Sequence, residues 1–288
     1  MTKVIRLTGG LGNQLFQYAF SKQLQDEVFF DLSGYETDDK RRYELGHFCC
    51  CVKAASPELL EGFKDRYVRR RIPKLLRQVL GLSKYIVHSS RVCEKSSLVY
   101  DPELARREGD CYYLGFFQSE KYFCAYRREL LRDFALRDEL DEANLEFLRQ
   151  IRSCNSVSLH VRRGDYVTLA DIYGLCDVQY YRRAAAYVAG LVKDPVFFVF
   201  SDDIPWAKEN LRLDYPTVFV DVNDDGRAHF DLELLKNCKH NVIANSSFSW
   251  WGAWLNENPE KIVVAPKVWL KAYAHEKSDT VPDAWVQL

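Results

Sequence analysis

Short apolar runs alternate with amphipathic stretches through the second half of the chain. A continuous apolar run bounded by turn residues is typical of a strand buried on both faces, and apolar residues three and four positions apart are typical of a helix. This alternation predicts a parallel sheet covered on both faces, with ligands bound beyond the carboxyl ends of its strands. The predicted strands are 156–161, 196–200, 218–221, 241–244 and 262–265, and the predicted helices are 178–191, 205–212, 230–238 and 248–256.

The first half also opens with a strand and a helix, but the alternation stops after residue 25. Residues 3–7 predict a strand, residues 8–13 a glycine-rich turn and residues 14–25 an amphipathic helix. Between residues 31 and 115, glycine, proline and charged residues interrupt every period. This stretch therefore predicts a less regular part of a first domain.

A change of pattern near residue 150 indicates where two domains meet. Residues 137–152 predict an amphipathic helix that connects the halves. The whole chain has 288 residues, which exceeds the usual size of one hydrophobic core. We therefore predict an α/β protein with an N-terminal domain over 1–150 and a C-terminal domain over 151–288.

Composition and charge exclude several classes of protein. Hydrophobic residues make up 47% of the chain, which excludes disorder as its main state, and 40 Lys and Arg against 41 Asp and Glu give no basis for binding nucleic acid. The N-terminus lacks the apolar stretch of a signal peptide, and no apolar run approaches the length of a membrane span. Nine cysteines without a C-x-x-C pair predict reduced thiols, and we expect a cytoplasmic protein.

Polar residues gather directly after the predicted strands. Arg162 and Arg163 follow the first strand of the second half, and Ser246 and Ser247 follow the fourth, where they open a helix. Arginine forks and the free N–H groups at a helix start both favour an anion, so this edge predicts a diphosphate ligand. The alternative explanation is structural: Arg162 pairs locally with Asp165, and the serines cap the helix.

Several catalytic motifs are absent from the sequence. Gly10 and Gly12 begin a dinucleotide-binding pattern, but Leu15 stands where its third glycine belongs, and neither a P-loop nor a G-x-S-x-G elbow occurs. No two aspartates stand two positions apart, so the D-x-D pair with which many sugar-nucleotide transferases hold a divalent ion is missing. The histidines show no zinc spacing, and His160 suits either a buried core position or the site. We therefore predict no metal site.

Three motifs are spread along the chain. They are GGLGNQLFQY at 9–18, HVRRGDY at 160–166 and NSSFSWW at 245–251, and the segments FSDD at 200–203 and DLELL at 231–235 lie between them. In this order they resemble the bacterial galactoside α-1,2-fucosyltransferases of glycosyltransferase family 11. The resemblance covers nearly the full chain.

The resemblance implies a fold and a reaction. The fold is of the GT-B type, in which two Rossmann-like domains face each other across a cleft. GDP-β-L-fucose is the implied donor, held by the C-terminal domain, and a terminal β-galactose is the implied acceptor on the N-terminal side. Transfer to the galactose 2-hydroxyl proceeds with inversion and needs neither a metal nor another cofactor.

The resemblance also assigns roles to individual residues. Arg162 and Arg163 match arginines that neutralise the departing diphosphate, Asp231 matches a carboxylate that binds guanine, and Asn13 matches an asparagine near the reacting centre. Serines of the third motif match serines near the phosphates. The expected donor-binding residues are Gly12, Arg162, Arg163, Asp202, Asp231, Ser246, Ser247 and Ser249.

The general base for the acceptor hydroxyl stays open at this point. Asp165 is the first candidate, two residues beyond the arginine pair, but this position suits an ion pair that orients the arginines equally well. Asp171 and His160 are the other candidates. The expected catalytic residues are Arg162, Asp165, Asn13 and His160.

Two other functions are compatible with these residues. One is a related GDP-sugar transferase that forms a different fucosyl linkage, and the other is a catalytically silent carbohydrate-binding protein. The acceptor is expected to be a galactose-terminated oligosaccharide, an O-antigen unit or a lipid-linked glycan. For a lipid-linked acceptor, the basic segment 66–77 suits peripheral contact with an anionic membrane, and its alternative explanation is a solvated helix face.

Overall fold

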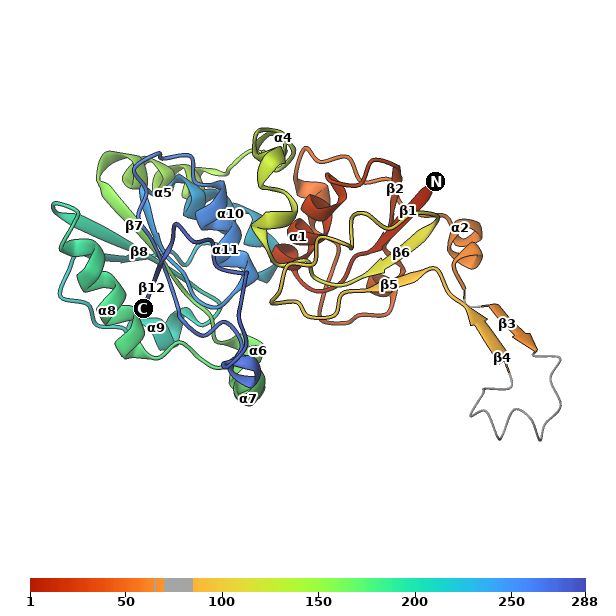
Figure 1. Ribbon diagram of the computed structural model, residues 1–288. Coiled ribbons are helices and arrows are strands. Elements are labelled where there is room, and N and C mark those ends of the chain that lie inside the picture. Colours follow the sequence, from red (N-terminus) through yellow and green to blue (C-terminus); the bar gives the residue numbers. More distant parts are fainter. Residues whose placement is uncertain (65, 70–84) are drawn as a thin grey trace.

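The computed structural model describes residues 1–64, 66–69 and 85–288, with the backbone alone described at 66–69, 85–88 and 225. Two parallel sheets lie side by side (Figure 1). The predicted membrane-contacting segment 66–77 falls largely outside the described residues. Only the backbone of its first part is described, as strand β3 (Arg66–Arg69), which pairs with β4 (Tyr85–His88) in an antiparallel hairpin.

The C-terminal sheet has six parallel strands in the order β9-β8-β7-β10-β11-β12. Counted along the chain this is the order 3-2-1-4-5-6 of a Rossmann fold. All five predicted strands occur, with ends shifted by at most two residues, and β12 was not predicted. The strands are β7 (Asn155–Val161), β8 (Pro195–Ser201), β9 (Thr217–Phe219), β10 (His240–Val242), β11 (Val263–Ala265) and β12 (Val286–Gln287).

Helices cover both faces of this sheet. Alternate residues of β8 point to opposite sides: Phe197 and Val199 belong to the core beneath α8 and α9, and Phe198 and Phe200 to the core beneath α5 and α10. The four predicted helices occur as α8 to α11, and the predicted connector is α5, which begins only after its Asp141 cap. The helices are α5 (Glu142–Ser153), α6 (Gly164–Thr168), α7 (Ala170–Tyr173), α8 (Val178–Ala189), α9 (Ile204–Asn210), α10 (Ala228–Asn237) and α11 (Ser247–Leu255).

The N-terminal sheet has four parallel strands in the order β2-β1-β6-β5. The predicted first strand is β1, and the predicted helix is α1, which begins inside the segment predicted as a turn. Gly12 and Asn13 therefore lie in the first turn of a helix, which corrects that prediction. The elements are β1 (Thr2–Arg6), α1 (Leu11–Ser21), β2 (Glu27–Asp31), α2 (Pro57–Gly62), β5 (Arg91–Cys93), β6 (Cys111–Leu114) and α4 (Arg127–Asp133).

In the described part of residues 31–115, the stretch predicted as less regular, two short 3-10 turns, η1 and η2, lie before the strands. The strands β5 and β6 of this stretch are short, so the sequence period that would reveal them covers only a few residues. The 3-10 helices of the described chain are η1 (Ser33–Glu36), η2 (Leu45–His47), η3 (Glu120–Tyr122), η4 (Cys124–Tyr126), η5 (Asp225–Arg227) and η6 (Lys271–Tyr273).

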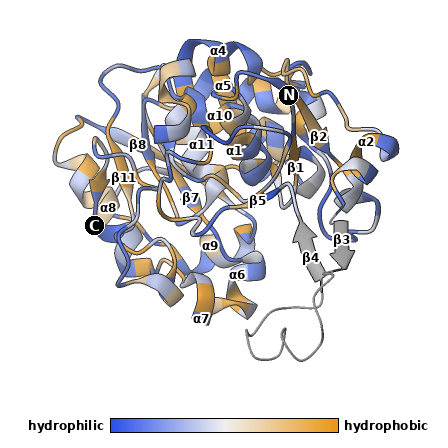
Figure 2. Ribbon diagram, turned by 45° about the vertical axis from the view of Figure 1, so that its right-hand side comes forward, coloured by the Kyte–Doolittle hydropathy of each residue, from blue (hydrophilic) through white to orange (hydrophobic). Residues whose placement is uncertain are grey.

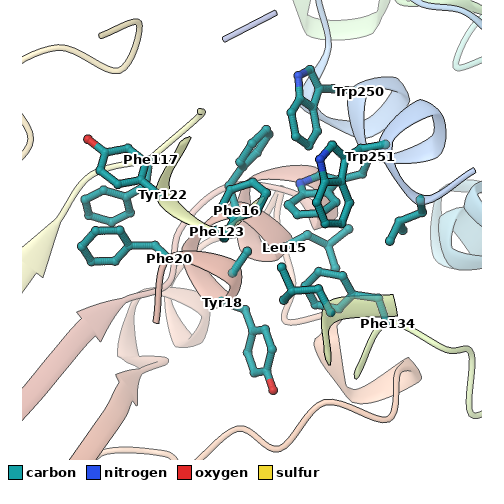
Figure 3. Close-up of a cluster of buried hydrophobic side chains, with 14 of the residues drawn as sticks. Leu15, Phe16, Tyr18, Phe20, Phe117, Tyr122, Phe123, Phe134, Trp250 and Trp251 are labelled. Atoms are coloured by element: carbon teal, nitrogen blue, oxygen red, sulfur yellow. The ribbon is translucent and has the colours of Figure 1, made fainter. Parts of the chain in front are cut away.

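One hydrophobic core joins the two sheets. Helix α1 packs against α11, and the ring of Phe16 lies 4.5 Å from Trp250 and 4.9 Å from Trp251 (Figure 3). Phe123 stacks on Trp251 at 5.3 Å. The predicted α/β fold of the GT-B type, with two Rossmann-like sheets, is confirmed. The domain boundary near residue 150 stays a prediction, because residues from both sides of it share this core.

Helices α6 and α7 carry apolar side chains on the outside of the molecule. Val167, Leu169 and Ile172 are exposed, and α7 appears orange at the lower end of the ribbon in Figure 2.

Among the helices that the structure describes, none combines the length and the apolar character that a membrane span requires.

Candidate active site

In each sheet there is one switch point, where two neighbouring strands are connected to the chain on opposite sides. In the C-terminal sheet it lies between β7 and β10, which are neighbours although β8 and β9 follow β7 in the chain. In the N-terminal sheet it lies between β1 and β6. Open α/β sheets bind ligands beyond the carboxyl ends of the strands at such a switch point. The loops after β7 and β10, and those after β1 and β6, are therefore the places to examine.

Gly12 brings the two switch points together. It stands where the start of α1 meets the start of α11, and a Cβ atom at Gly12 would lie 2.4 Å from the backbone nitrogen of Phe248 and 2.6 Å from Ser247 Oγ. Trp251 Nε1 donates a hydrogen bond of 3.0 Å to the Gly12 carbonyl. Only glycine permits this approach. Gly12, predicted as a donor-binding residue, thus packs between two helix starts that follow opposing strand ends.

Arg162 follows β7 and contacts two carboxylates. Its Nη2 donates to Asp165 Oδ1 at 2.5 Å, and its Nη1 lies 2.9 Å from Asp202 Oδ2. The guanidinium also lies 5.3 Å from the ring of Tyr166. Burial opposes the charge, but Asp202 and Asp165 outweigh it and raise the pKa of Arg162. The arginine is a fixed cation at the switch point.

Arg163 is held by the next strand end. Its backbone nitrogen donates to Asp202 Oδ1 at 2.8 Å, and its Nε lies 3.3 Å from Asp203 Oδ2, while the guanidinium stacks 3.8 Å from the ring of Trp206. Asp202, predicted to bind the donor, therefore links the loops after β7 and β8. A Cβ at Gly164 would lie 2.5 Å from Asp202 Oδ2, so a larger residue there would displace this carboxylate.

Asp165 forms the ion pair that the sequence analysis weighed against a general base. Its Oδ1 accepts from Arg162, and its Oδ2 accepts from Arg41 Nη2 at 2.5 Å. Arg41 was not predicted, because 124 positions separate it from Asp165 and its own segment shows no period. Asp171, the other carboxylate considered, is fully exposed and pairs with Lys271 at 3.1 Å.

The predicted serines stand at the start of α11 but differ in their surroundings. Ser246 is the N-cap residue, and its side chain makes no capping hydrogen bond. Ser247 opens the helix, whose first N–H groups have no partner within it. Ser249 is buried, and its hydroxyl donates to the carbonyls of Ala244 and Ser246. Ser249 is thus engaged in the backbone, whereas the helix start is built to receive an anion.

His160 lies at the end of β7, with its ring 5.4 Å from Phe248 of α11. It is buried, and its Nδ1 has no hydrogen-bond partner. Burial, aided by the charge of Arg162, lowers the pKa of His160 to about 3. The imidazole is therefore neutral at physiological pH. Both explanations weighed for this residue remain compatible with its place, since it is a core residue directly beneath the arginine pair.

Asn13 lies in the N-terminal half, in the first turn of α1. Its Oδ1 accepts a hydrogen bond of 2.9 Å from Gln118 Nε2, and Trp269 Nε1 donates to Gln118 Oε1 at 3.3 Å. Gly9 adopts a φ of +79°, and a Cβ there would lie 2.6 Å from Asn13 Nδ2. Gln118 follows β6, so Asn13 joins the two loops of the N-terminal switch point. Sequence reasoning did not identify Gln118.

Asp231 belongs to a second polar network, in the first turn of α10. Its Oδ1 accepts from Asn223 Nδ2 at 2.7 Å, and Asn223 also exchanges hydrogen bonds with the buried amide of Asn144. Burial raises the pKa of Asp231 to about 7, against the hydrogen bond from Asn223 and the charge of Arg227. A half-buried carboxylate with a raised pKa gains from further hydrogen-bond donors, such as those on the edge of a purine base.

Two histidines that the sequence analysis left scattered stack on each other. The rings of His47 and His229 lie 3.8 Å apart at an angle of 7°, and Asp138 Oδ2 lies 2.6 Å from His47 Nδ1 and 3.8 Å from His229 Nε2. The three groups are close enough to share a metal ion. The lone pairs of imidazoles lie in their ring planes, however, so two parallel rings do not converge on one tetrahedral ion. The cluster fits a hydrogen-bonded stack better than a metal centre.

Comparison with known proteins places the chain in a family. The profile described as Glycosyl transferase family 11 matches residues 105–288, which include the ends of β7 and β10. The chain belongs to glycosyltransferase family 11. Two Escherichia coli proteins match it over nearly their whole length. The O-antigen biosynthesis glycosyltransferase WbnK is 33% identical over 98% of this chain and 99% of WbnK, and an alpha-1,2-colitosyltransferase is 34% identical over 99% of this chain and 98% of its own length.

More distant proteins are also similar to this family 11 glycosyltransferase, over about half of the chain or more. The pig galactoside alpha-(1,2)-fucosyltransferase 2 is 31% identical over 49% of this chain and 44% of its own. Among solved structures, Arabidopsis thaliana FUT1 in complex with GDP has a TM-score of 0.47 at 10% identity, covering 91% of this chain and 69% of FUT1. NodZ alpha-1,6-fucosyltransferase soaked with GDP-fucose also has a TM-score of 0.47, at 14% identity, covering 88% and 92%. The predicted family is confirmed.

Proposed function

We propose that this family 11 glycosyltransferase transfers L-fucose from GDP-β-L-fucose to the 2-hydroxyl of a terminal β-galactose, with inversion and without a metal. The observation that carries the proposal is the position of Arg162 and Arg163 at the switch point of the C-terminal sheet, beside the start of α11. Full-length relatives named for O-antigen biosynthesis and α-1,2 transfer support the linkage.

The arginine pair and the helix start receive the leaving group. As the bond between fucose and GDP breaks, negative charge grows on the β-phosphate, and fixed cations and N–H dipoles stabilise that charge without reorganising. Arg162 and Arg163 are held by carboxylates of neighbouring loops, so their positions are set before the donor binds. The charge of a metal ion is then not needed for departure of GDP.

Asp231 holds the guanine base in this proposal. Its carboxylate is half-buried in the first turn of α10 and accepts one hydrogen bond from Asn223. The N1–H and the amino group of guanine supply the further donors that stabilise its anion. Asn13 lies across the contact between α1 and α11, where its amide is directed by Gln118 and suits a hydroxyl of the acceptor or of the transferred sugar.

Asp165 orients the arginines in this proposal. A general base needs a carboxylate oxygen that faces the acceptor hydroxyl. Each oxygen of Asp165 contacts an arginine instead, Arg162 on one side and Arg41 on the other. The proposal therefore assigns to Asp165 the ion-pair role, which the sequence analysis weighed equally.

The similarity to an alpha-1,2-colitosyltransferase favours a second donor, GDP-colitose. Colitose lacks one hydroxyl of fucose, so the same diphosphate and guanine contacts serve both donors, and the choice depends on a polar group that meets the extra hydroxyl. A buried polar group that loses its partner discriminates strongly between such sugars.

Release of GDP tests the proposal directly. The purified chain is incubated with lactose and with GDP-fucose, GDP-colitose or GDP-mannose in turn, with and without EDTA, and the product linkage is determined by NMR. We expect an α-1,2-linked fucosyl product at a rate that EDTA does not change. A requirement for a divalent ion would contradict the role given to the arginines. Turnover with GDP-colitose but not with GDP-fucose would identify GDP-colitose as the donor instead of GDP-fucose.

A further inference from the structure

Arg41 reaches from the first half of the chain to the end of β7. It stands in a turn in which Asp38 Oδ1 accepts hydrogen bonds from the backbone nitrogens of Lys40, at 2.9 Å, and Arg41, at 3.0 Å. Its Nη2 lies 2.5 Å from Asp165 Oδ2, and its Nη1 lies 3.6 Å from the position of a Cβ on Gly10. Arg41 therefore spans the loops at the two switch points.

The charges at the end of β7 balance only when Arg41 is counted. Arg162 and Arg163 face three carboxylates, so the two arginines alone give the group a net negative charge that opposes a diphosphate. Arg41 supplies the third cation. The three carboxylates are those of Asp165, Asp202 and Asp203.

The position of Arg41 also determines how Arg162 meets Asp165. Arginine and a carboxylate prefer to pair through two parallel hydrogen bonds. Arg162 contacts only Oδ1 of Asp165, because Arg41 occupies Oδ2 and Asp202 holds the other terminal nitrogen of Arg162. Without Arg41, Asp165 Oδ2 competes with Asp202 for that nitrogen, and the guanidinium then turns toward Asp165 and away from a ligand.

We propose that Arg41 is a positioning residue for the donor diphosphate, acting through Asp165 on Arg162. The inference rests on the proposed function, since it takes a nucleoside diphosphate as the ligand at the end of β7. It makes binding of that ligand depend on contact between the two halves of the chain. Arg41 touches neither the base nor the sugar in this role, so its effect is confined to the phosphates.

Calorimetric titration with GDP and with guanosine tests this inference. We expect Arg41→Ala to weaken GDP binding about tenfold, the loss of one charge-assisted contact, and to change guanosine binding less than about twofold. Arg41→Lys, which keeps the charge, restores part of the GDP affinity. Lys40→Ala removes an exposed neighbouring cation and serves as the matched control, with GDP affinity unchanged. Thermal unfolding establishes that each variant is folded, and Arg41→Gln replaces Arg41→Ala should the latter not fold.

The same substitution in an Asp165→Asn variant tests whether Arg41 acts through Asp165. In an Asp165→Asn chain, the further change Arg41→Ala is expected to lower GDP affinity less than it does in the wild-type chain, because the carboxylate through which Arg41 orients Arg162 is gone. An equal loss in both backgrounds overturns the inference, as does an equal loss of guanosine binding or an Arg41→Ala chain with wild-type GDP affinity. Failure of the wild-type chain to bind GDP is a different result, and it rejects the proposed function itself.

Discussion

Two of the regions in which the halves of this glycosyltransferase touch have opposite character. The apolar contact, formed by Phe16, Phe123, Trp250 and Trp251, is buried (Figure 3). The charged contact, formed by Arg41 with Asp165, leaves each of its two side chains more than a third exposed. Both regions flank the place where α1 begins against α11.

The apolar contact holds the halves together, whereas the charged contact serves ligand binding in the proposed function. Burial of large aromatic side chains stabilises a contact in proportion to the area removed from water, whatever ligand is present. A half-exposed ion pair contributes little to stability, but its charge acts on any phosphate nearby. We therefore expect substitutions in the apolar contact to change the free energy of unfolding, and substitutions at the charged loops to change activity.

Truncation of Phe16 has the largest expected effect. Phe16→Ala removes a fully buried ring that touches both Trp250 and Trp251, and is expected to lower the free energy of unfolding by about 3 to 5 kcal/mol. Urea unfolding followed by tryptophan fluorescence measures it. Phe116→Ala, at a side chain that is 37% exposed, is the control, with a change of about 0.5 kcal/mol. Equal losses in both variants would show that the contact between α1 and α11 is not a main source of stability.

Removal of Arg162 has the next largest expected effect, and it acts on activity instead of stability. Arg162→Ala is expected to lower kcat about 10²- to 10³-fold, because a fixed cation at the leaving group is lost. The control is Arg149→Ala, which removes an exposed arginine from α5 and leaves kcat unchanged. GDP release under saturating donor measures both. A folded Arg162→Ala chain with normal turnover would falsify the role given to the arginine pair.

The sequence predicted the C-terminal sheet well because its strands are buried on both faces. Runs such as that of β8 are apolar throughout, and no other element gives that pattern at that length. The N-terminal sheet was predicted only at β1. Strand β6 has four residues and pairs with strands on either side of a long irregular stretch, so nothing local marks it. The same stretch is held by tertiary hydrogen bonds, such as that from the Gln14 amide to the Arg42 carbonyl.

The site divides in the same manner. Arg162, Arg163 and Ser246 could be predicted, because they follow strands and the carboxyl ends of parallel strands meet at one edge. Arg41 could not, since only the folded chain brings it to Asp165. The stack of His47 in η2 on His229 in α10 likewise joins residues from the two halves of the chain, and no spacing in the sequence indicates it.

A methyl group at Gly12 is expected to have a smaller effect on stability than the loss of Phe16. Gly12→Ala places a Cβ against the backbone at Ser247 and Phe248, which the helix start avoids only by moving away, at a cost of about 1 to 3 kcal/mol in the free energy of unfolding. GDP affinity falls with it, because the start of α11 shifts. Gly62→Ala, where nothing lies within 4 Å, is the control and is expected to be neutral or slightly stabilising. Lost stability with unchanged GDP affinity would separate the helix contact from the donor site.

The smallest expected effect concerns pH and the base of the donor. Burial raises the pKa of Asp231 to about 7, so the carboxyl is largely protonated below that pH and cannot accept both donors of guanine. Affinity for guanosine should therefore be highest above pH 8 and fall by up to about tenfold as the pH is lowered through 7, toward a plateau at which the protonated carboxyl accepts one donor. Guanosine is used instead of GDP because it carries no phosphate that titrates in this range. Asp231→Asn should bind weakly with no such slope, whereas Asp171→Asn, at a fully exposed carboxyl that pairs with Lys271, should keep the wild-type profile. A slope that survives Asp231→Asn would assign the titration to another residue, and with it the binding of the base.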